Sequence, residues 1–315
     1  MIEVKNLTKK YDKTIAVDNI SFEINDGEIV GFLGPNGAGK TTTMNMLTGF
    51  IEPTSGKVLI NGYDIDTKPK MAKKQFGYMP ENVPLYGDLT VTEFISYMAD
   101  LKLVPRKEKK AEIARVIKEA GLESVKNKLT KNLSRGYKQR TSLAGALVGN
   151  PKILILDEPT VGLDPKQVTE IRNFIKDLGK KHTVLVSSHI LSEISQMCSK
   201  VIILKEGKIV AIDSAENLEE VTSGGLELLV TVEEKNPNFD KIKNKIPSIE
   251  SIVKQDNVND SDEEIYVVRC KDKTDIRKEF LKQCANEDIT ILEIHKRESS
   301  LEEAFLKITE DKEDK

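Results

Sequence analysis

Eight consecutive residues, GPNGAGKT at positions 34–41, have the spacing G-x-x-x-x-G-K-[ST] of a phosphate-binding loop. They follow an apolar run and precede a helical run, TTTMNMLTG. Phosphate oxygens must approach backbone N–H groups closely, so glycines line such a turn and the helix N-terminus offers unpaired donors. Lys40 can place its charge on the β- and γ-phosphates, and the Thr41 hydroxyl can bind Mg²⁺. The spacing therefore predicts a nucleotide site.

We expect the whole turn to contact the nucleotide, with the Thr42 hydroxyl near the α-phosphate. The expected contact residues are Gly34, Pro35, Asn36, Gly37, Ala38, Gly39, Lys40, Thr41 and Thr42. The alternative interpretation is a glycine-rich tight turn without a ligand.

Two adjacent carboxylates end a second apolar run, ILILDE at positions 153–158. The carboxyl end of a buried strand is where open α/β sheets place their ligands, and buried carboxylates without partners are costly. We therefore expect Asp157 to hold Mg²⁺, directly or through water. Glu158 points the other way from the strand and could polarise the attacking water as a general base.

A sheet has to position these residues, and the first two thirds of the chain alternate short β-branched runs with helical patterns. This alternation predicts an α/β domain with a largely parallel sheet. Runs that are apolar on both faces predict buried central strands at 28–34, 153–156, 183–188 and 201–204. Runs 2–11 and 16–25 alternate partly, which predicts an antiparallel β subdomain with one face in water.

Between residues 90 and 149 the apolar residues change to helical spacing, which predicts an inserted helical subdomain over about 84–150. The first domain is expected to end near residue 222, before the Ser-Gly-Gly breaker at 223–225.

A second domain is expected over residues 226–315, with the element order β-α-β-β-α-β of a ferredoxin-like α+β fold. The predicted strands are 226–233, 248–255, 263–270 and 289–296, and the predicted helices are 238–245 and 274–286. A closing helix is predicted from the capping-box pair Ser299 and Glu302 and from the apolar stripe Leu301, Ala304, Phe305 and Ile308.

Composition excludes several classes. The 48 basic and 51 acidic side chains give a formal net charge of −3, which weighs against a general nucleic-acid binder, so no nucleic acid is expected as a partner. No apolar run approaches the roughly 18 residues that cross a bilayer, and no secretory pattern is legible at the N-terminus. Cys198, Cys270 and Cys284 lie far apart without metal or redox spacing, which predicts buried reduced thiols in a cytosolic protein.

With these motifs in this order, residues 2–213 resemble the ATP-binding subunit of an ABC transporter. Tyr11 stands where the family stacks an aromatic ring on the adenine. GYMPE places Glu81 in the lid segment, where the family usually has Gln, and Glu81 is a plausible oxygen ligand for Mg²⁺ or water. The charge of Glu81 puts the usual hydrogen-bonding role in doubt.

LSRGYKQR at 133–140 resembles the family signature, whose common form is LSGGQ. Ser134 and Gly136 are kept, and the resemblance implies that they offer a hydroxyl and an N–H to the γ-phosphate of ATP held by a second subunit. Arg135 is hypothesised to lie at the rim of that shared site. PTVGLDP places Asp164 in the loop that touches the partner, and TVLVSSHIL places His189 where the family's switch histidine contacts the γ-phosphate.

The resemblance implies an ATPase that uses ATP and Mg²⁺ and that pairs with a second nucleotide-binding subunit, either a copy of itself or a paralogue. It also implies an integral membrane permease on a separate chain, and a cytoplasmic location on the inner face of the cell membrane. The apolar and aromatic loop ENVPLYGDLT is expected either to dock that permease or to pack on its own helix.

The signature variant, Glu81 and the C-terminal module resemble the export branch with multidrug and gliding-type members. Two other functions stay open: a soluble ABC ATPase acting on a non-membrane partner, and a regulatory module that binds nucleotide without hydrolysis.

Overall fold

The computed structural model describes residues 1–82, 85–214, 217, 226–233, 237–255, 264–272 and 274–297. The chain forms two compact units, Met1–Ala215 and Glu216–Lys315. The end of the first domain that we predicted at residue 222 lies outside the described residues.

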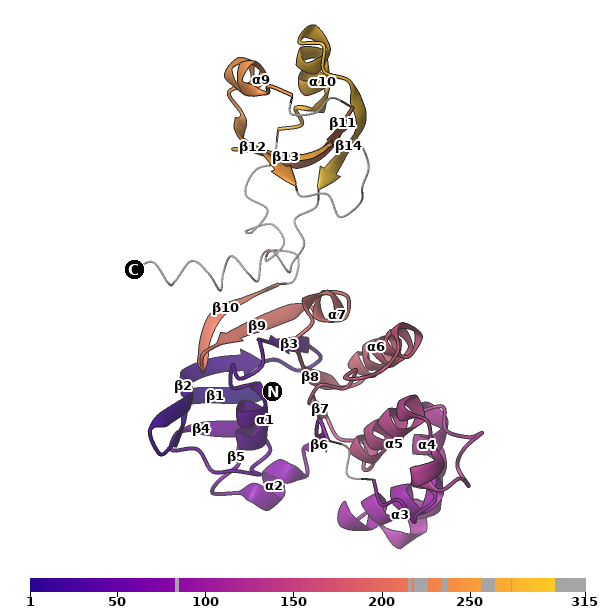
Figure 1. The fold of residues 1–315 in the computed structure, drawn as a ribbon. Helices are drawn as coiled ribbons and strands as arrows, with labels where there is room; N and C mark the ends of the chain where they lie inside the picture. The colour runs from indigo at the N-terminus through magenta and orange to yellow at the C-terminus, as the bar shows by residue number, and fades with distance from the viewer. Residues whose placement is uncertain are drawn as a thin grey trace. The chain divides into compact units, whose positions relative to one another are not determined.

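A six-stranded sheet in the order β10-β9-β3-β8-β7-β6 forms the centre of the first unit (Figure 1). Its strands are β3 (Ile29–Leu33), β6 (Phe76–Met79), β7 (Ile153–Leu156), β8 (Thr183–Ser188), β9 (Lys200–Lys205) and β10 (Lys208–Ser214). β9, β3, β8, β7 and β6 are mutually parallel, and β10 pairs with β9 in the antiparallel sense. β7 and β8 are buried throughout, as their continuous apolar runs predicted.

An antiparallel sheet in the order β2-β1-β4-β5 lies beside the central sheet (Figure 1). Its strands are β1 (Ile2–Tyr11), β2 (Thr14–Ile24), β4 (Ser55–Ile60) and β5 (Tyr63–Asp64), and the short helices α1 (Lys40–Leu47) and α2 (Pro69–Lys73) follow β3 and β5. One apolar cluster joins the two sheets through α1, with Phe22 of β2 against Phe32 of β3. The loop before α1 is thereby fixed between both sheets.

The helices of residues 91–147 form a group on one side of the sheets (Figure 1). They are α3 (Val91–Leu101), α4 (Arg106–Glu119), the 3₁₀ turn η1 (Thr130–Asn132) and α5 (Arg135–Leu147). Two further helices, α6 (Pro165–Gly179) and α7 (Leu191–Ser195), follow β7 and β8. Within the described part of the chain, no helix has both the length and the apolar character that a bilayer crossing requires.

In its described residues, the second unit is a four-stranded antiparallel sheet in the order β12-β13-β11-β14 with two helices (Figure 1). Its elements are β11 (Glu227–Val232), α9 (Asp240–Lys245), β12 (Ile249–Gln255), β13 (Glu264–Cys270), α10 (Arg277–Asn286) and β14 (Ile291–Arg297). Its core joins Phe239, Tyr266 and Phe280, whose rings pack against one another. The predicted closing helix lies outside the described residues.

A capping box fixes the start of the helical group. The Thr90 hydroxyl accepts a hydrogen bond from the Glu93 N–H, and the Glu93 carboxylate accepts one from the Thr90 N–H at 2.7 Å. These bonds satisfy donors that the first turn of α3 would otherwise leave unpaired.

Replacing Thr90 by Ala should lower the free energy of unfolding by about 1 kcal/mol, because the cap is lost. Thr169→Ala is the matched control, since Thr169 is exposed inside α6 and its hydroxyl only bonds back to the Pro165 carbonyl. Urea denaturation of both variants measures the difference. Equal stabilities would contradict the assignment of the cap.

Candidate functional site

The glycine-rich loop is closed by its own lysine. The Lys40 ammonium donates to the Gly34 carbonyl at 2.7 Å and to the Pro35 carbonyl at 3.3 Å, and the side chain is 6% exposed. Gly39 caps α1 at φ 100°, and a Cβ at this position would lie 2.5 Å from the Ala16 carbonyl oxygen. The turn therefore needs a glycine here, and it presents the first N–H groups of α1 together with a buried cation.

Asp157 lies at the end of β7 and is completely buried. Its Oδ1 accepts a hydrogen bond from the Ser187 hydroxyl at 2.5 Å, while among the described residues Oδ2 has no hydrogen-bonding partner. Burial raises the pKa of this carboxyl, and the negative charges of Glu81 and Glu158 raise it further, against the opposing effects of Ser187 and Lys40. The site therefore holds more negative charge than the protein alone compensates.

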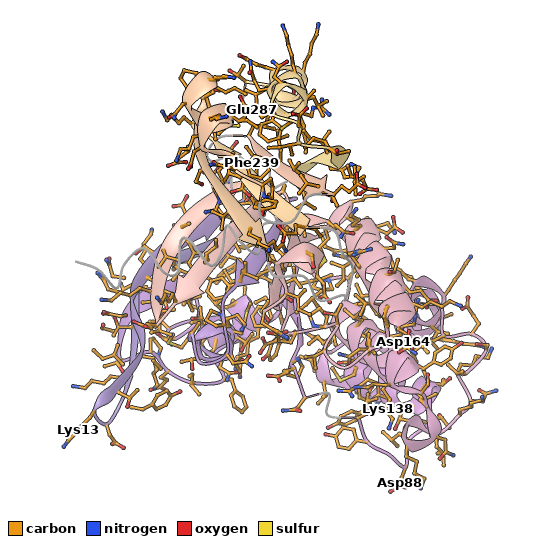
Figure 2. The ribbon with its side chains drawn as sticks, turned by 45° about the horizontal axis from the view of Figure 1, so that its top comes forward. Lys13, Asp88, Lys138, Asp164, Phe239 and Glu287 are labelled. Atoms are coloured by element: carbon orange, nitrogen blue, oxygen red, sulfur yellow. The ribbon has the colours of Figure 1, made fainter. Side chains whose placement is uncertain are left out.

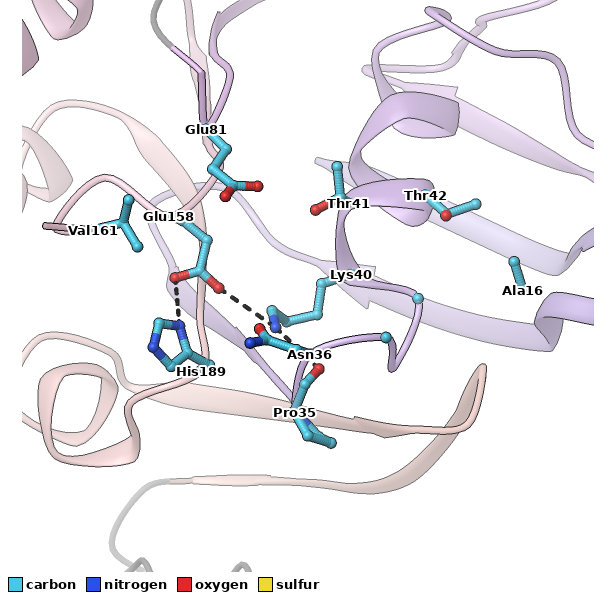
Figure 3. A pocket seen from close by; sticks show the side chains of 12 residues that line it. Ala16, Pro35, Asn36, Lys40, Thr41, Thr42, Glu81, Glu158, Val161 and His189 are labelled. Carbon is cyan, nitrogen blue, oxygen red and sulfur yellow. Dashed lines mark hydrogen bonds and ion pairs between the residues drawn. The ribbon is translucent and has the colours of Figure 1, made fainter.

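Glu158 has φ 48°, a left-handed conformation that is unfavourable for a residue with a side chain. Its N–H donates to the Ser187 hydroxyl at 2.9 Å, so one serine on β8 holds both acids. Its Oε1 lies 3.4 Å from the Lys40 nitrogen, and its Oε2 lies 2.9 Å from Nδ1 of His189 (Figure 3). The side chain is thus fixed between a cation and an imidazole.

These groups surround a cavity of about 280 Å³ (Figure 3). It is lined by Ala16, Pro35, Asn36, Gly37, Gly39, Lys40, Thr41, Thr42, Glu81, Glu158, Val161 and His189. The structure thereby brings together most of the residues that the sequence predicted for one site. Ala16 and Val161 were missed, because small apolar residues carry no chemical signal of their own.

The residues present fit Mg²⁺. This ion takes hard oxygen ligands such as carboxylates and hydroxyls, and it is bound by one or two carboxylates together with phosphate oxygens. The buried Oδ2 of Asp157 is a carboxylate oxygen without a hydrogen bond among the described residues, and Thr41 and Glu81 line the adjoining cavity. A divalent cation here would offset the repulsion between the acids.

A second cavity of about 380 Å³ holds the signature residues. It is lined by Gly121, Ser134, Gly136, Tyr137, Arg140, Asp164, Lys166, Gln167, Glu170 and Ile171. Ser134 caps α5 by accepting from the Tyr137 N–H, and Asp164 caps α6 by accepting from the Gln167 N–H at 2.9 Å. Asp164 is labelled at the start of α6 in Figure 2. The predicted residues of one site therefore form two separate groups in the chain.

Arg135, where the common signature has Gly, packs on the loop after Glu158. A Cβ built on Gly162, which has φ 68°, would lie 2.1 Å from the centre of the Arg135 guanidinium. The guanidinium is the far end of a flexible side chain and could shift, so the positive φ is what favours glycine at position 162. Arg135 therefore lies against a neighbouring loop of the same chain, which the sequence pattern did not reveal.

Tyr11 lines neither cavity. It ends β1 opposite Thr14, is 47% exposed, and has the Lys9 ammonium 5.1 Å from its ring centre. Gly34 and Ala38 belong to the loop without lining the first cavity, although the Gly34 carbonyl binds Lys40.

Comparison with known proteins agrees with this geometry. The family model described as "ABC transporter" matches residues 17–161. An uncharacterized ABC transporter ATP-binding protein of Bacillus subtilis, YxlF, is 32% identical and covers 98% of this chain and 99% of its own length. The chain belongs to the ABC transporter family, as an ATP-binding subunit. The ATPase activity predicted from the motifs is confirmed as the activity of this family.

Two further matches of this ABC subunit are informative. The linearmycin resistance ATP-binding protein LnrL of Bacillus subtilis is 31% identical and covers 98% of both chains. A solved dimeric, post-hydrolysis structure of the ATP-binding cassette MJ0796 with ADP and Pi is 28% identical, with a TM-score of 0.62 over 68% of this chain and 99% of that one.

Asp157→Asn should raise the thermal midpoint of the nucleotide-free protein in EDTA at pH 7. The pKa of Asp157 is higher in the folded state than the usual aspartate value of 3.8, so the folded chain binds more protons than the unfolded chain. Stability therefore falls as pH rises from the unfolded pKa through the folded one. A neutral amide removes this penalty. The same variant should lose the further stabilisation that Mg²⁺ gives in the presence of ATP.

Asp177→Asn is the control for this measurement, because Asp177 is exposed and forms its ion pair with the exposed Lys180. Differential scanning calorimetry with and without Mg²⁺ gives both midpoints. A variant that is destabilised in EDTA and still responds to Mg²⁺ would refute the assignment of Asp157.

Proposed function

We propose that two copies of this subunit, or this subunit and a paralogue, close around two ATP molecules, with the loop of one chain facing the signature of the other. The observation that carries the proposal is the separation of the two cavities within one chain. Lys40 and Glu158 line one of them and Ser134 lines the other, so neither cavity holds all the predicted groups. The solved relative, which is dimeric and in a post-hydrolysis state with ADP and Pi, supports the association of two such chains.

In this mechanism Glu158 is the general base. Its Oε1 is engaged by Lys40 and its Oε2 by His189. Triphosphate oxygens would attract the Lys40 ammonium more strongly than one carboxylate does, which frees Oε1 to accept a proton from water. His189 keeps Oε2 fixed, so the Glu158 carboxylate stays oriented when Lys40 leaves Oε1.

The remaining residues hold the nucleotide. Thr41, Asp157 and Glu81 would hold Mg²⁺, which neutralises charge on the phosphates when bound. The loop residues Gly34 to Thr42 would surround the phosphates, and Tyr11 would stack on the base from the end of β1. Ser134, Gly136 and Asp164 would act on the nucleotide of the partner chain, with Arg135 near the same edge.

We also propose that a separate membrane permease docks at an apolar pocket of about 380 Å³ lined by Tyr86, Gly87, Asp88, Leu89 and Tyr97. Tyr86 and Tyr97 are 52% and 39% exposed, and their rings meet edge to face at 5.3 Å. Exposed aromatic pairs are typical centres of protein interfaces. Val83, which belonged to the predicted docking loop, lies outside the described residues.

Export is the proposed direction, and the resistance role named for the relative LnrL supports it. The subunit would lie in the cytoplasm against the inner face of the membrane, held there by its permease. The second unit is proposed to be ferredoxin-like, because its strand order and antiparallel pairing follow from a β-α-β-β-α-β chain.

Replacing Glu158 by Gln should leave ATP binding intact and lower kcat by about 100-fold or more, because the amide cannot accept the proton from water. Closed dimers should then accumulate with ATP and Mg²⁺. Steady-state hydrolysis and size-exclusion chromatography with light scattering measure both effects.

Glu123→Gln supplies a matched control, since Glu123 is exposed outside both cavities. Wild-type hydrolysis by Glu158→Gln would show that another group is the base. A variant that stays monomeric with ATP would refute the shared site.

Tyr86→Ala should weaken capture of the membrane permease by about 30-fold, since a buried interface aromatic is commonly worth about 2 kcal/mol. Affinity purification of the tagged subunit from detergent-solubilised membranes measures the capture. Phe50→Ala is the control, because Phe50 is 78% exposed and lies outside this pocket. Equal capture by both variants would place the permease elsewhere.

A further inference from the structure

A buried hydrogen bond joins the loop that begins at Glu158 to the segment that runs from His189 into α7. The Thr160 hydroxyl donates to Oε2 of Glu193 at 2.5 Å, and the two residues are 5% and 7% exposed. Glu193 belongs to α7, and Thr160 lies in the loop after β7. A buried carboxylate that accepts such a bond is costly to leave without its partner, so the contact holds the segments firmly.

The bond closes a ring with the pair already described. Thr160 follows Glu158 by two residues, and Glu193 follows His189 by four. The Glu158–His189 contact at 2.9 Å therefore connects the same two segments that Thr160 and Glu193 connect at 2.5 Å. Two cross-links between two short segments fix both distance and orientation, whereas one cross-link leaves a hinge.

Both segments need outside support. Glu158 keeps a strained left-handed backbone, and such strain persists only when neighbouring contacts determine the conformation. α7 has five residues, and its N-cap, Ile190, makes no side-chain capping bond. A helix of this length is not stable by itself, so tertiary contacts must hold it in place.

A second buried bond extends the support to the signature helix. The Gln139 amide of α5 donates to the Pro159 carbonyl at 2.9 Å, directly before Thr160. The loop after Glu158 is thus held by α5 on one side and by α7 on the other. A displacement of α5 would move this loop through Gln139, and the loop contacts His189 through Glu158.

We propose that Thr160 and Glu193 are positioning residues for hydrolysis, which hold Glu158 and His189 in register and connect them to the signature helix. This inference rests on the proposed function of Glu158 as the base. Neither residue lines the nucleotide cavity, so their effect is on the geometry of the pair and not on nucleotide affinity.

Thr160→Val removes the hydroxyl at nearly constant volume and should lower kcat about 10- to 100-fold, because a misplaced catalytic group loses this much rate. KM for ATP should stay within about twofold of the wild type. Thr160→Ser keeps the donor and should restore most of the rate. Glu193→Gln keeps an acceptor and should stay active, whereas Glu193→Ala should lose activity as Thr160→Val does.

Thr48→Val is the matched control. Thr48 is a threonine with 6% exposure whose hydroxyl bonds to the Met44 carbonyl of its own helix, outside both segments. A kcat of Thr160→Val within twofold of that of Thr48→Val would overturn the inference, as would an equal rise in KM and fall in kcat. A common loss of stability would affect both variants alike.

Amide hydrogen exchange distinguishes failure of this inference from failure of the proposed function. If the wild-type chain does not hydrolyse ATP, the proposed function is refuted. The Thr160–Glu193 bond is then tested by the rate of amide exchange in residues 189–195. Thr160→Val should accelerate exchange there, whereas Thr48→Val should not. Unchanged exchange in Thr160→Val would overturn the inference whatever the activity of the wild type.

Discussion

Negative charge concentrated at the carboxyl ends of two neighbouring strands of the central sheet is the constraint on which the rest of the first unit depends. Glu81 follows β6, and Asp157 and Glu158 follow β7. Burial raises the pKa of Asp157, and the negative charges of Glu81 and Glu158 raise it further, whereas the Lys40 ammonium lowers it. The glycine-rich loop holds Lys40 against Glu158, and Ser187 and His189 fix the orientation of the two acids after β7.

The loop and the acids therefore cannot be understood separately. The Lys40 ammonium is held by loop carbonyls and by Glu158. A polyphosphate has the charge to replace these weaker partners, so ligand binding changes the surroundings of the proposed base through one side chain. This connection needs no large movement of the backbone, because the distances involved are those of hydrogen bonds and ion pairs.

The sequence predicted the elements whose signal is local. The run at 153–156 is apolar at every position, and β7 is a fully buried strand with those bounds. The spacing of Gly34 to Thr41 likewise predicted a turn that leads into α1. Most residues of the predicted loop line the first cavity.

Contacts between distant segments were not predictable in the same way. Thr160 and Glu193 are 33 residues apart, and their bond exists only because β7 and β8 are neighbours in the sheet. The contact of Arg135 with Gly162 and the division of the candidate residues between two cavities depend on the packing of α5 and α6 in the same way. The burial of Glu193, which marks it as a carboxylate that needs a partner, is visible in the structure and not in the sequence.

The backbone of Glu158 has a consequence for engineering and for evolution. At φ 48° a glycine or an asparagine has a lower backbone conformational energy than a glutamate. Relief of such strain stabilises the folded state by about 1 kcal/mol. A screen that selects heat-resistant variants without measuring turnover would therefore favour replacement of the residue proposed as the base. Position 158 is a place where thermal resistance and catalysis are selected in opposite directions.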